Sequence, residues 1–211
     1  MTRKLLILFI LLGFAWNAYA VNRSDSWNFK VYLDDKPVGF HTFTIDGESA
    51  DQKLKSVARF DVDFFIITAY SYQHESNERW TDDCLAEIKA STNDNGEKLL
   101  VQGQSIQGKF DLATPKGKLD IPGCVMTFAY WNPKMLSQKR LLNPQNGEYV
   151  DVDIKPIGQE SIKVNGKNIP ASHYRLISEK FLIDLWYSPD QRWVALDSTL
   201  ENGRILHYRI E

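Results

Sequence analysis

The stretch TAYSYQHESNERW, residues 68–80, places aromatic and polar side chains at every second position. In a β-strand successive side chains point to opposite faces, so this pattern predicts one shared face, which carries Tyr70, Tyr72, His74, Ser76, Glu78 and Trp80. Such a face is too polar for a plain core and too aromatic for an ordinary solvated surface. It predicts the wall of a concave ligand site, where aromatic surface supplies contact area. The alternative is an amphipathic outer strand whose tyrosines and tryptophan keep their polar tips in water.

The same alternation recurs on both sides of this strand, in short runs of β-branched and aromatic residues separated by turn residues. Asn95-Gly96 and Asn165-Gly166 accept the positive φ that tight hairpins require. Strands joined by short turns without intervening helices favour antiparallel pairing. Further strands are expected at 27–33, 38–45, 53–62, 85–92, 98–104, 162–164, 167–169, 171–177, 181–187, 193–198 and 205–210.

One helix signal interrupts this pattern. Asn132 can cap a helix, Pro133 suits its first position, and Asn143-Pro144 can end it. The sequence therefore predicts a mainly β fold, a strongly curved antiparallel sheet or open barrel with one short helix at about residues 133–142. Apolar residues are dense across 124–142, which is consistent either with a plug or lid over the mouth of the sheet or with a simple cap on the core.

Residues 1–20 have the pattern of a cleavable secretory leader. Arg3 and Lys4 precede a short apolar run, and Ala18-Tyr19-Ala20 forms a small-x-small cleavage site. A membrane span would need roughly 20 consecutive apolar residues, whereas this run stops earlier. The residue after the expected cut is Val21, with no nearby cysteine to accept a lipid. We therefore expect one exported, unanchored domain at residues 21–211, in the periplasm.

The charge of the expected mature chain excludes some partners. Two of the 25 basic residues lie in the leader, so 23 remain against 27 acidic ones, a formal charge of −4. The lysines are scattered and form no basic block. A nucleic-acid or anionic-membrane partner would favour a clustered positive surface, so neither is expected. The sequence does not fix the oligomeric state.

Two cysteines, Cys84 and Cys124, remain after the leader. In an oxidising compartment such a pair most simply forms a disulfide, and two free buried thiols are the alternative. Neither cysteine has the C-x-x-C spacing or the nearby histidine of a metal site. The histidines lie far apart on different expected strands, so no metal site is expected. The chain also lacks glycine-rich phosphate loops and the G-x-S-x-G motif of a hydrolytic nucleophile, and no cofactor is expected.

Several motifs together are similar to those of a known family. They are Gly39-x-His41-x-Phe43, Tyr70-x-Tyr72-x-His74 with Glu78 and Trp80, Cys124 with the string TFAYWNP at 127–133, Leu141-Leu142-Asn143, Gly147-Glu148, the string IDLWY at 183–187, and Gly203-Arg204. This set resembles the exported bacterial family called domain of unknown function 6134, over nearly the whole mature chain. The resemblance implies a Gram-negative periplasmic setting and brings no established activity. A more distant architectural likeness to the lipoprotein-carrier fold suggests lipid handling by analogy alone.

These observations favour a soluble periplasmic protein that binds or carries a hydrophobic ligand, such as a lipid or acyl chain. Its expected lining residues are Tyr70, Tyr72, Trp80 and Trp131. The second hypothesis is an enzyme that modifies an envelope lipid or glycan, with His74 and Glu78 as acid/base candidates. Because these two residues are four apart on one strand, their Cα atoms would lie about 13 Å apart, too far for a direct pair. A structural module that binds protein at a sheet edge is the third hypothesis.

Overall fold

The computed structural model describes residues 24–48, 50–64 and 67–211, so the expected leader and its cleavage site lie outside the described part. Most of the described chain forms one antiparallel sheet of 13 strands. In spatial order these are β11 (Asp153–Val164), β12 (Lys167–Ile177), β13 (Leu182–Tyr187), β14 (Trp193–Thr199), β15 (Ile205–Ile210), β1 (Ser24–Leu33), β2 (Lys36–Glu48), β3 (Asp51–Phe64), β4 (Ile67–Thr81), β5 (Cys84–Asp94), β6 (Glu97–Ile106), β7 (Lys109–Thr114) and β8 (Gly117–Pro122).

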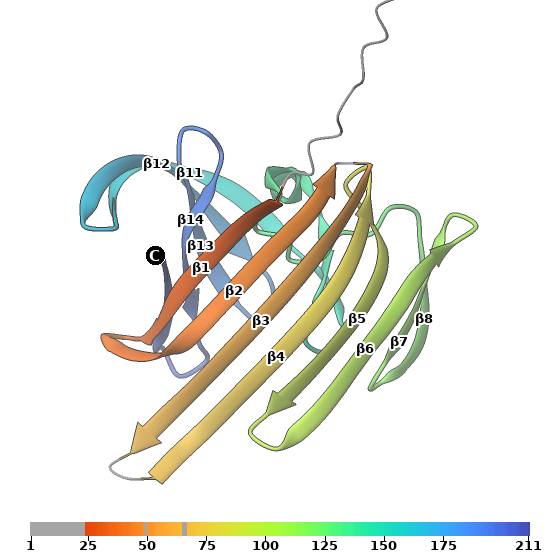
Figure 1. Ribbon diagram of the computed structural model, residues 1–211, viewed down its shortest axis with the longest axis horizontal. Helices are drawn as coiled ribbons and strands as arrows, with labels where there is room; N and C mark the ends of the chain where they lie inside the picture. Colours follow the sequence, from red (N-terminus) through yellow and green to blue (C-terminus); the bar gives the residue numbers. More distant parts are fainter. Residues whose placement is uncertain (1–23, 49, 65–66) are drawn as a thin grey trace, which may run out of the picture.

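The sheet is built from two meanders that meet where the first and last described strands pair. β1 runs antiparallel to β15, with Phe29 opposite Ile210 and Leu33 opposite Leu206. β11 and β8 form the two ends of the strand order, so the sheet is open. Figure 1 shows β5 to β8 on one side of the long strands β1 to β4 and β11 to β14 on the other. This arrangement confirms the predicted mainly β fold with a curved, open antiparallel sheet.

The hairpin signals in the sequence are confirmed. Asn95 and Gly96 have φ of 49° and 101°, and they join Asp94 to its strand partner Glu97. Asn165-Gly166 likewise separates β11 from β12. Two strands of the large sheet were not expected, β7 and β8, although Phe110 and Leu112 alternate on the buried face of β7. The ranges 167–169 and 171–177 form a single strand, β12.

The predicted helix at residues 133–142 is wrong in kind and length. Pro133–Ser137 forms a 3-10 helix of five residues, η1, in which Asn132 accepts a hydrogen bond from the Lys134 amide as expected of a cap. Residues 140–142 are instead strand β9 (Arg140–Leu142), which pairs with β10 (Tyr149–Asp151). The Leu142 amide donates to the Met126 carbonyl, so tertiary hydrogen bonds replace those of a second helical turn. The described part of the chain contains no α-helix.

Residues 123–152, which we call the crossing segment, pack against the inner face of the sheet. The Leu85 amide in β5 donates to the Val125 carbonyl, and the Tyr187 hydroxyl in β13 donates to the Tyr130 carbonyl. The segment therefore spans the interior between the two arms of the sheet, which are β5 to β8 on one side of the long strands and β11 to β14 on the other. At Gly147 a Cβ atom would lie 2.5 Å from the Thr114 side chain, so this close approach requires glycine.

The interior contains two groups of buried apolar side chains. The first cluster combines residues from both arms with the crossing segment, and includes Trp80, Leu85, Phe110, Leu141 and Trp193. The second cluster is smaller and belongs to β1–β4: Val31, Leu33, Val38, Ala58, Phe60 and Tyr72. The crossing segment contributes to the first cluster and not to the second.

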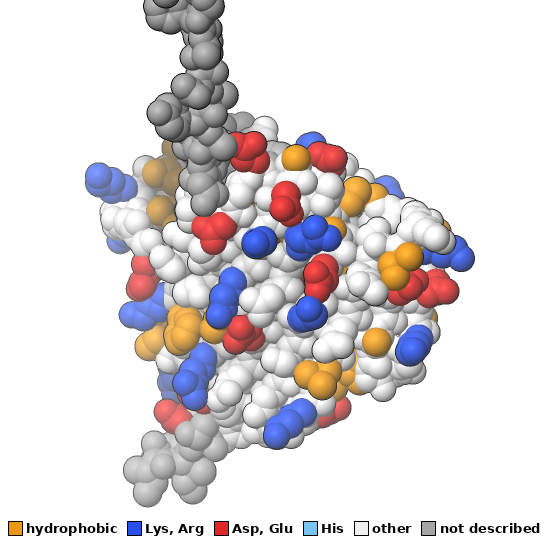
Figure 2. All heavy atoms as spheres, turned by 45° about the vertical axis from the view of Figure 1, so that its right-hand side comes forward, with side chains coloured by type: hydrophobic (Ala, Val, Ile, Leu, Met, Phe, Trp, Pro, Cys, Tyr) orange, Lys and Arg blue, Asp and Glu red, His pale blue; other side chains and the backbone are white. Residues whose placement is uncertain are grey.

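The outer surface carries charges of both signs. Figure 2 shows Lys and Arg side chains interspersed with Asp and Glu, while hydrophobic side chains form small, separate groups. This face therefore shows no basic patch. Among the described residues no helix is long and apolar enough to cross a membrane.

Candidate functional site

The inner face of β4 carries the side chains singled out in the sequence. Residues 72–80 alternate strictly, with Tyr72, His74, Glu78 and Trp80 buried and the intervening side chains exposed. Tyr72 is 7% exposed and Trp80 is 0% exposed, so this face is turned inward and its polar tips are not in bulk water. The outer-strand alternative is therefore wrong, because the sheet curves around this strand.

A cavity of about 640 Å³ lies between this face and the crossing segment. Its volume falls in the range of roughly 300–1,000 Å³ that small-molecule sites occupy. The lining contains apolar and aromatic side chains from both arms of the sheet together with a few polar groups. Lining residues from the sheet include Leu33, Val38, His41, Phe43, Leu54, Ser56, Phe60, Tyr70, Tyr72, His74, Glu78, Ile183, Trp193, Leu196 and Tyr208, and those from the crossing segment include residues 127–131 and 143–145.

Three of the four expected lining residues border this cavity, namely Tyr70, Tyr72 and Trp131. Trp80 does not. It lies in the first cluster, where its ring packs edge-on against Trp131 at 5.3 Å between centroids. Trp80 therefore supports the cavity wall from behind. The weak catalytic candidates His74 and Glu78 also border the cavity.

Glu78 is a buried acid without a cationic partner among the described residues. Its carboxylate accepts hydrogen bonds from Ser76 Oγ at 3.0 Å, Trp80 Nε1 at 2.9 Å and Thr127 Oγ1 at 3.4 Å. Burial raises the pKa of Glu78 to about 7, and these three hydrogen bonds offset only part of that effect. Near neutral pH the carboxyl group therefore exists in both protonation states. Among the described lining residues it is the one acid that is buried.

His74 is held in its neutral form. Its Nδ1 lies 2.9 Å from the Thr92 hydroxyl, and that hydroxyl donates its hydrogen to the Gln145 carbonyl in the crossing segment. Nδ1 must therefore carry the hydrogen of the neutral ring. Burial lowers the pKa of His74 to about 4. An acid/base role would call for a second ionisable group within hydrogen-bond reach. The partner found in the described chain is Thr92, which does not titrate.

A second pair of polar residues, missed by the sequence reasoning, faces the same cavity. His41 Nε2 in β2 lies 2.7 Å from Ser56 Oγ in β3. The His41 ring stacks on Phe43 at 4.1 Å, and burial together with the nearby His74 holds its pKa well below the usual range. The alternation of His41 with Phe43 could have placed both on one face. Their meeting with Ser56 depends on strand register, which the sequence pattern does not show.

Three lining residues have a buried polar atom without a hydrogen-bond partner. These atoms are His41 Nδ1, the Tyr72 hydroxyl and Trp131 Nε1. An uncompensated buried polar atom destabilises a fold by about 1–3 kcal/mol, and most such atoms in folded proteins have partners. Three of them around one cavity are a feature of a site that a ligand can complete.

Two cations border the cavity, and each is paired with a carboxylate. Lys180, between β12 and β13, contacts Glu148 of the crossing segment at 2.8 Å, and Lys116, between β7 and β8, contacts the same carboxylate at 2.6 Å. Hydrogen bonds from these lysines lower the pKa of Glu148 to about 2. Arg204 pairs with Asp34 at 2.8 Å. Glu148 therefore links the two arms of the sheet, because its one carboxylate pairs with both lysines.

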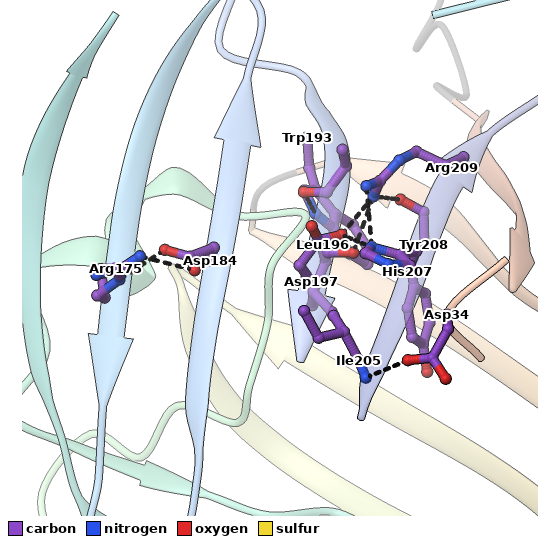
Figure 3. A network of polar contacts seen from close by, with 11 residues as sticks. Asp34, Arg175, Asp184, Trp193, Leu196, Asp197, Ile205, His207, Tyr208 and Arg209 are labelled. Carbon is purple, nitrogen blue, oxygen red and sulfur yellow. Dashed lines mark hydrogen bonds and ion pairs between the residues drawn. The ribbon is translucent and has the colours of Figure 1, made fainter. Parts of the chain in front are cut away.

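The outer face of β12–β15 carries a separate polar network (Figure 3). Asp184 accepts hydrogen bonds from Arg175 Nε at 2.8 Å and His173 Nε2 at 2.7 Å, and Asp197 pairs with Arg209 at 2.6 Å. Burial alone would raise the pKa of Asp184, but the hydrogen bonds from Arg175 and His173 outweigh it and lower that pKa. Since Asp184 and Asp197 are direct strand partners, these cations offset their repulsion.

The last features of this region are its disulfide bond and the arrangement of its potential metal ligands. Cys84 at the start of β5 is bonded to Cys124 at the start of the crossing segment, as predicted. Within the described ranges no group of three or more His, Cys, Asp or Glu side chains is arranged to hold a metal ion.

Comparisons with known proteins agree with this architecture. A family model described as "Domain of unknown function (DUF6134)" matches residues 29–211. A crystal structure of a beta-barrel-like protein of domain of unknown function DUF1849 from Brucella abortus is similar, with a TM-score of 0.66 and 11% sequence identity. The match covers 88% of this chain and 94% of that one, and at this identity it shows a shared fold. A comparison with curated proteins gave no match.

Proposed function

We propose, for a chain that belongs to the DUF6134 family, that it binds or carries a hydrophobic ligand such as a lipid or acyl chain in the cavity between its curved sheet and the crossing segment. The observation that carries this proposal is the cavity itself, about 640 Å³ in volume and walled largely by apolar and aromatic side chains. Such walls, with a few polar groups, are typical of small-molecule sites. We further propose that the protein acts in the periplasm as a soluble domain. The leader pattern and the Cys84–Cys124 bond support that placement.

Purification of the mature protein from a Gram-negative host, followed by native mass spectrometry and lipid extraction, tests the proposal. We expect a co-purifying lipid, and we expect the delipidated protein to bind the uncharged probe N-phenyl-1-naphthylamine with an increase in its fluorescence. A protein that carries no lipid and leaves the probe fluorescence unchanged would overturn the proposal.

A matched pair of variants links binding to the cavity. Ser198 in β14 borders the cavity, whereas Ser105 in β6 is exposed and lies outside it. Ser198→Trp is expected to fill part of the cavity and abolish probe binding, while Ser105→Trp is expected to leave it unchanged. Near-ultraviolet circular dichroism checks that both variants fold. Equal binding by both folded variants would place the probe elsewhere.

A hydrolytic function on an envelope lipid ester is the second candidate, because one observation favours it. Ser56 Oγ lies within hydrogen-bond reach of His41 in the same cavity, as a nucleophile and base would. The pair ranks second because His41 Nδ1 has no partner to orient the ring, and burial lowers the basicity of that ring. Hydrolysis of a long-chain p-nitrophenyl ester that Ser56→Ala abolishes would replace the carrier proposal.

A further inference from the structure

The charges around the cavity are arranged unevenly. Among the described residues its lining contains three acids, the buried Glu78 and the more exposed Asp94 and Glu201, against two cations, Lys180 and Arg204, which both lie outside the two buried clusters. Each cation already has a carboxylate partner, Glu148 for Lys180 and Asp34 for Arg204. An anionic headgroup that entered would thus find no unpaired cation among the described lining residues.

The remaining interior groups cannot neutralise an anion either. His41 in β2 and His74 in β4 lie on either side of Ala58 in β3, and both stay neutral near pH 7, because burial lowers the pKa of both rings. The tyrosines of the lining have raised pKa values for the same reason, so their hydroxyl groups keep their protons. Burying an unpaired charge is far less favourable than burying a hydrogen-bonded neutral group. The interior is therefore built for an uncharged ligand.

The unpartnered polar atoms of the lining can form hydrogen bonds with an uncharged ligand. The Tyr72 hydroxyl belongs to a side chain that is 7% exposed, and Trp131 Nε1 and His41 Nδ1 lie on the opposite and neighbouring walls of the same cavity. A purely hydrocarbon ligand would leave these atoms without hydrogen bonds. A hydroxyl or carbonyl oxygen supplies an acceptor for the indole N–H, and a hydroxyl can also donate.

We propose that the cavity selects an uncharged amphiphile, an apolar chain or ring system bearing a hydroxyl or carbonyl oxygen, and discriminates against the corresponding carboxylate because Glu148 and Asp34 occupy its cations. This inference rests on the proposed binding function and adds the chemical class of the ligand. It assigns Glu148 a role in specificity, although Glu148 is not among the residues that line the cavity.

Two probes of equal chain length, hexadecanol and palmitate, test the selection by displacement of N-phenyl-1-naphthylamine from the delipidated mature protein at pH 8. We expect the dissociation constant of hexadecanol to be at least about tenfold lower than that of palmitate, because the carboxylate finds no unpaired cation in the cavity. Palmitate binding as tight as that of hexadecanol would overturn the inference and leave the binding function standing. If neither probe displaces N-phenyl-1-naphthylamine and no lipid co-purifies, the proposed function itself fails.

A charge-matched pair of variants tests the mechanism of selection. Glu148→Gln removes the carboxylate that Lys180 shares with Lys116, and it is expected to strengthen palmitate binding about fivefold, as a partly exposed ion pair of about 1 kcal/mol would, with hexadecanol unchanged. Glu201→Gln changes the net charge equally at the rim of the cavity, but Glu201 has no ion-pair partner among the described residues, so it frees no cation. We expect it to change palmitate binding less than twofold or so. Equal effects of both variants would overturn the assigned role of Glu148.

Discussion

The first and second clusters of buried side chains, which we call the solid and the hollow end of the sheet interior, contain similar residues but pack differently. In the first cluster, side chains such as Leu85 and Leu141 are covered by the crossing segment and do not border the cavity. In the second cluster, Leu33, Val38, Phe60 and Tyr72 all border it. Both ends belong to one continuous sheet with the same alternation. The crossing segment fills the space around Leu85 and Leu141, whereas other first-cluster side chains, such as Phe43, Leu54 and Trp193, border the cavity as the second cluster does. The strand pattern is the same in both regions, so the packing of the crossing segment distinguishes filled from open interior.

Removal of the disulfide should affect the solid end most. The bond joins Cys84 to Cys124 across a sequence separation of 40 residues and fixes the start of the crossing segment against β5. In the chain-entropy account, the double variant Cys84→Ser, Cys124→Ser loses about 4 kcal/mol of unfolding free energy. Urea denaturation of the oxidised protein and the double variant measures the difference. An unchanged midpoint would show that the crossing segment is held by packing alone.

A matched pair of leucine truncations compares the two ends directly. Leu85 is 2% exposed in the first cluster, and Leu33 is 6% exposed in the second. Leu85→Ala is expected to lower the unfolding free energy by about 3 kcal/mol, because a new void forms in packed surroundings. Leu33→Ala should lower it by about 2 kcal/mol, because Leu33 already borders open space and has fewer contacts to lose. Denaturant midpoints provide the measurement. A larger loss for Leu33 would contradict the distinction between a solid and a hollow end.

Glu78 contacts Trp80 of the first cluster and Thr127 of the crossing segment, and its signal is specific because it depends on pH. Its pKa is about 7 in the folded protein against an ordinary value of 4.5, so the folded state binds the proton more tightly than the unfolded state. Its contribution to stability is complete below pH 4.5 and is lost as the pH rises toward 7. The slope is at most about 1.4 kcal/mol per pH unit within this window.

His41 and His74 have the opposite dependence, which must be separated from that of Glu78. Their lowered pKa values mean that their contribution is present above pH 6.5 and is lost as the pH falls, toward about 4 for His74. The two trends overlap, so the wild-type curve alone is not diagnostic. The difference in unfolding free energy between wild type and Glu78→Gln, measured from pH 4 to 8, isolates Glu78. A difference that does not change with pH would show that Glu78 has an ordinary pKa.

Much of the local structure could be predicted from the sequence, because side-chain alternation and turn chemistry act over a few residues. The inward face of β4 and the Asn95-Gly96 hairpin are of this kind. The helix at 133–142 was mispredicted because its capping signals are local, whereas the hydrogen bond from Leu142 to Met126 is tertiary. The strands β7 and β8 were missed because their runs are short and rich in polar residues.

By itself the sequence determined the strand-rich fold, the pairing of Cys84 with Cys124 and the shared face of Tyr70, Tyr72, His74 and Glu78, since each depends on local periodicity or on a simple count of residues. Tertiary structure alone decided that β1 pairs with β15, that His41 meets Ser56, and that Glu148 reaches Lys180 from the crossing segment. These contacts join residues distant in the chain, and their geometry follows from sheet curvature and register. The cavity, and with it the proposed ligand, exists only where those long-range contacts leave space unfilled.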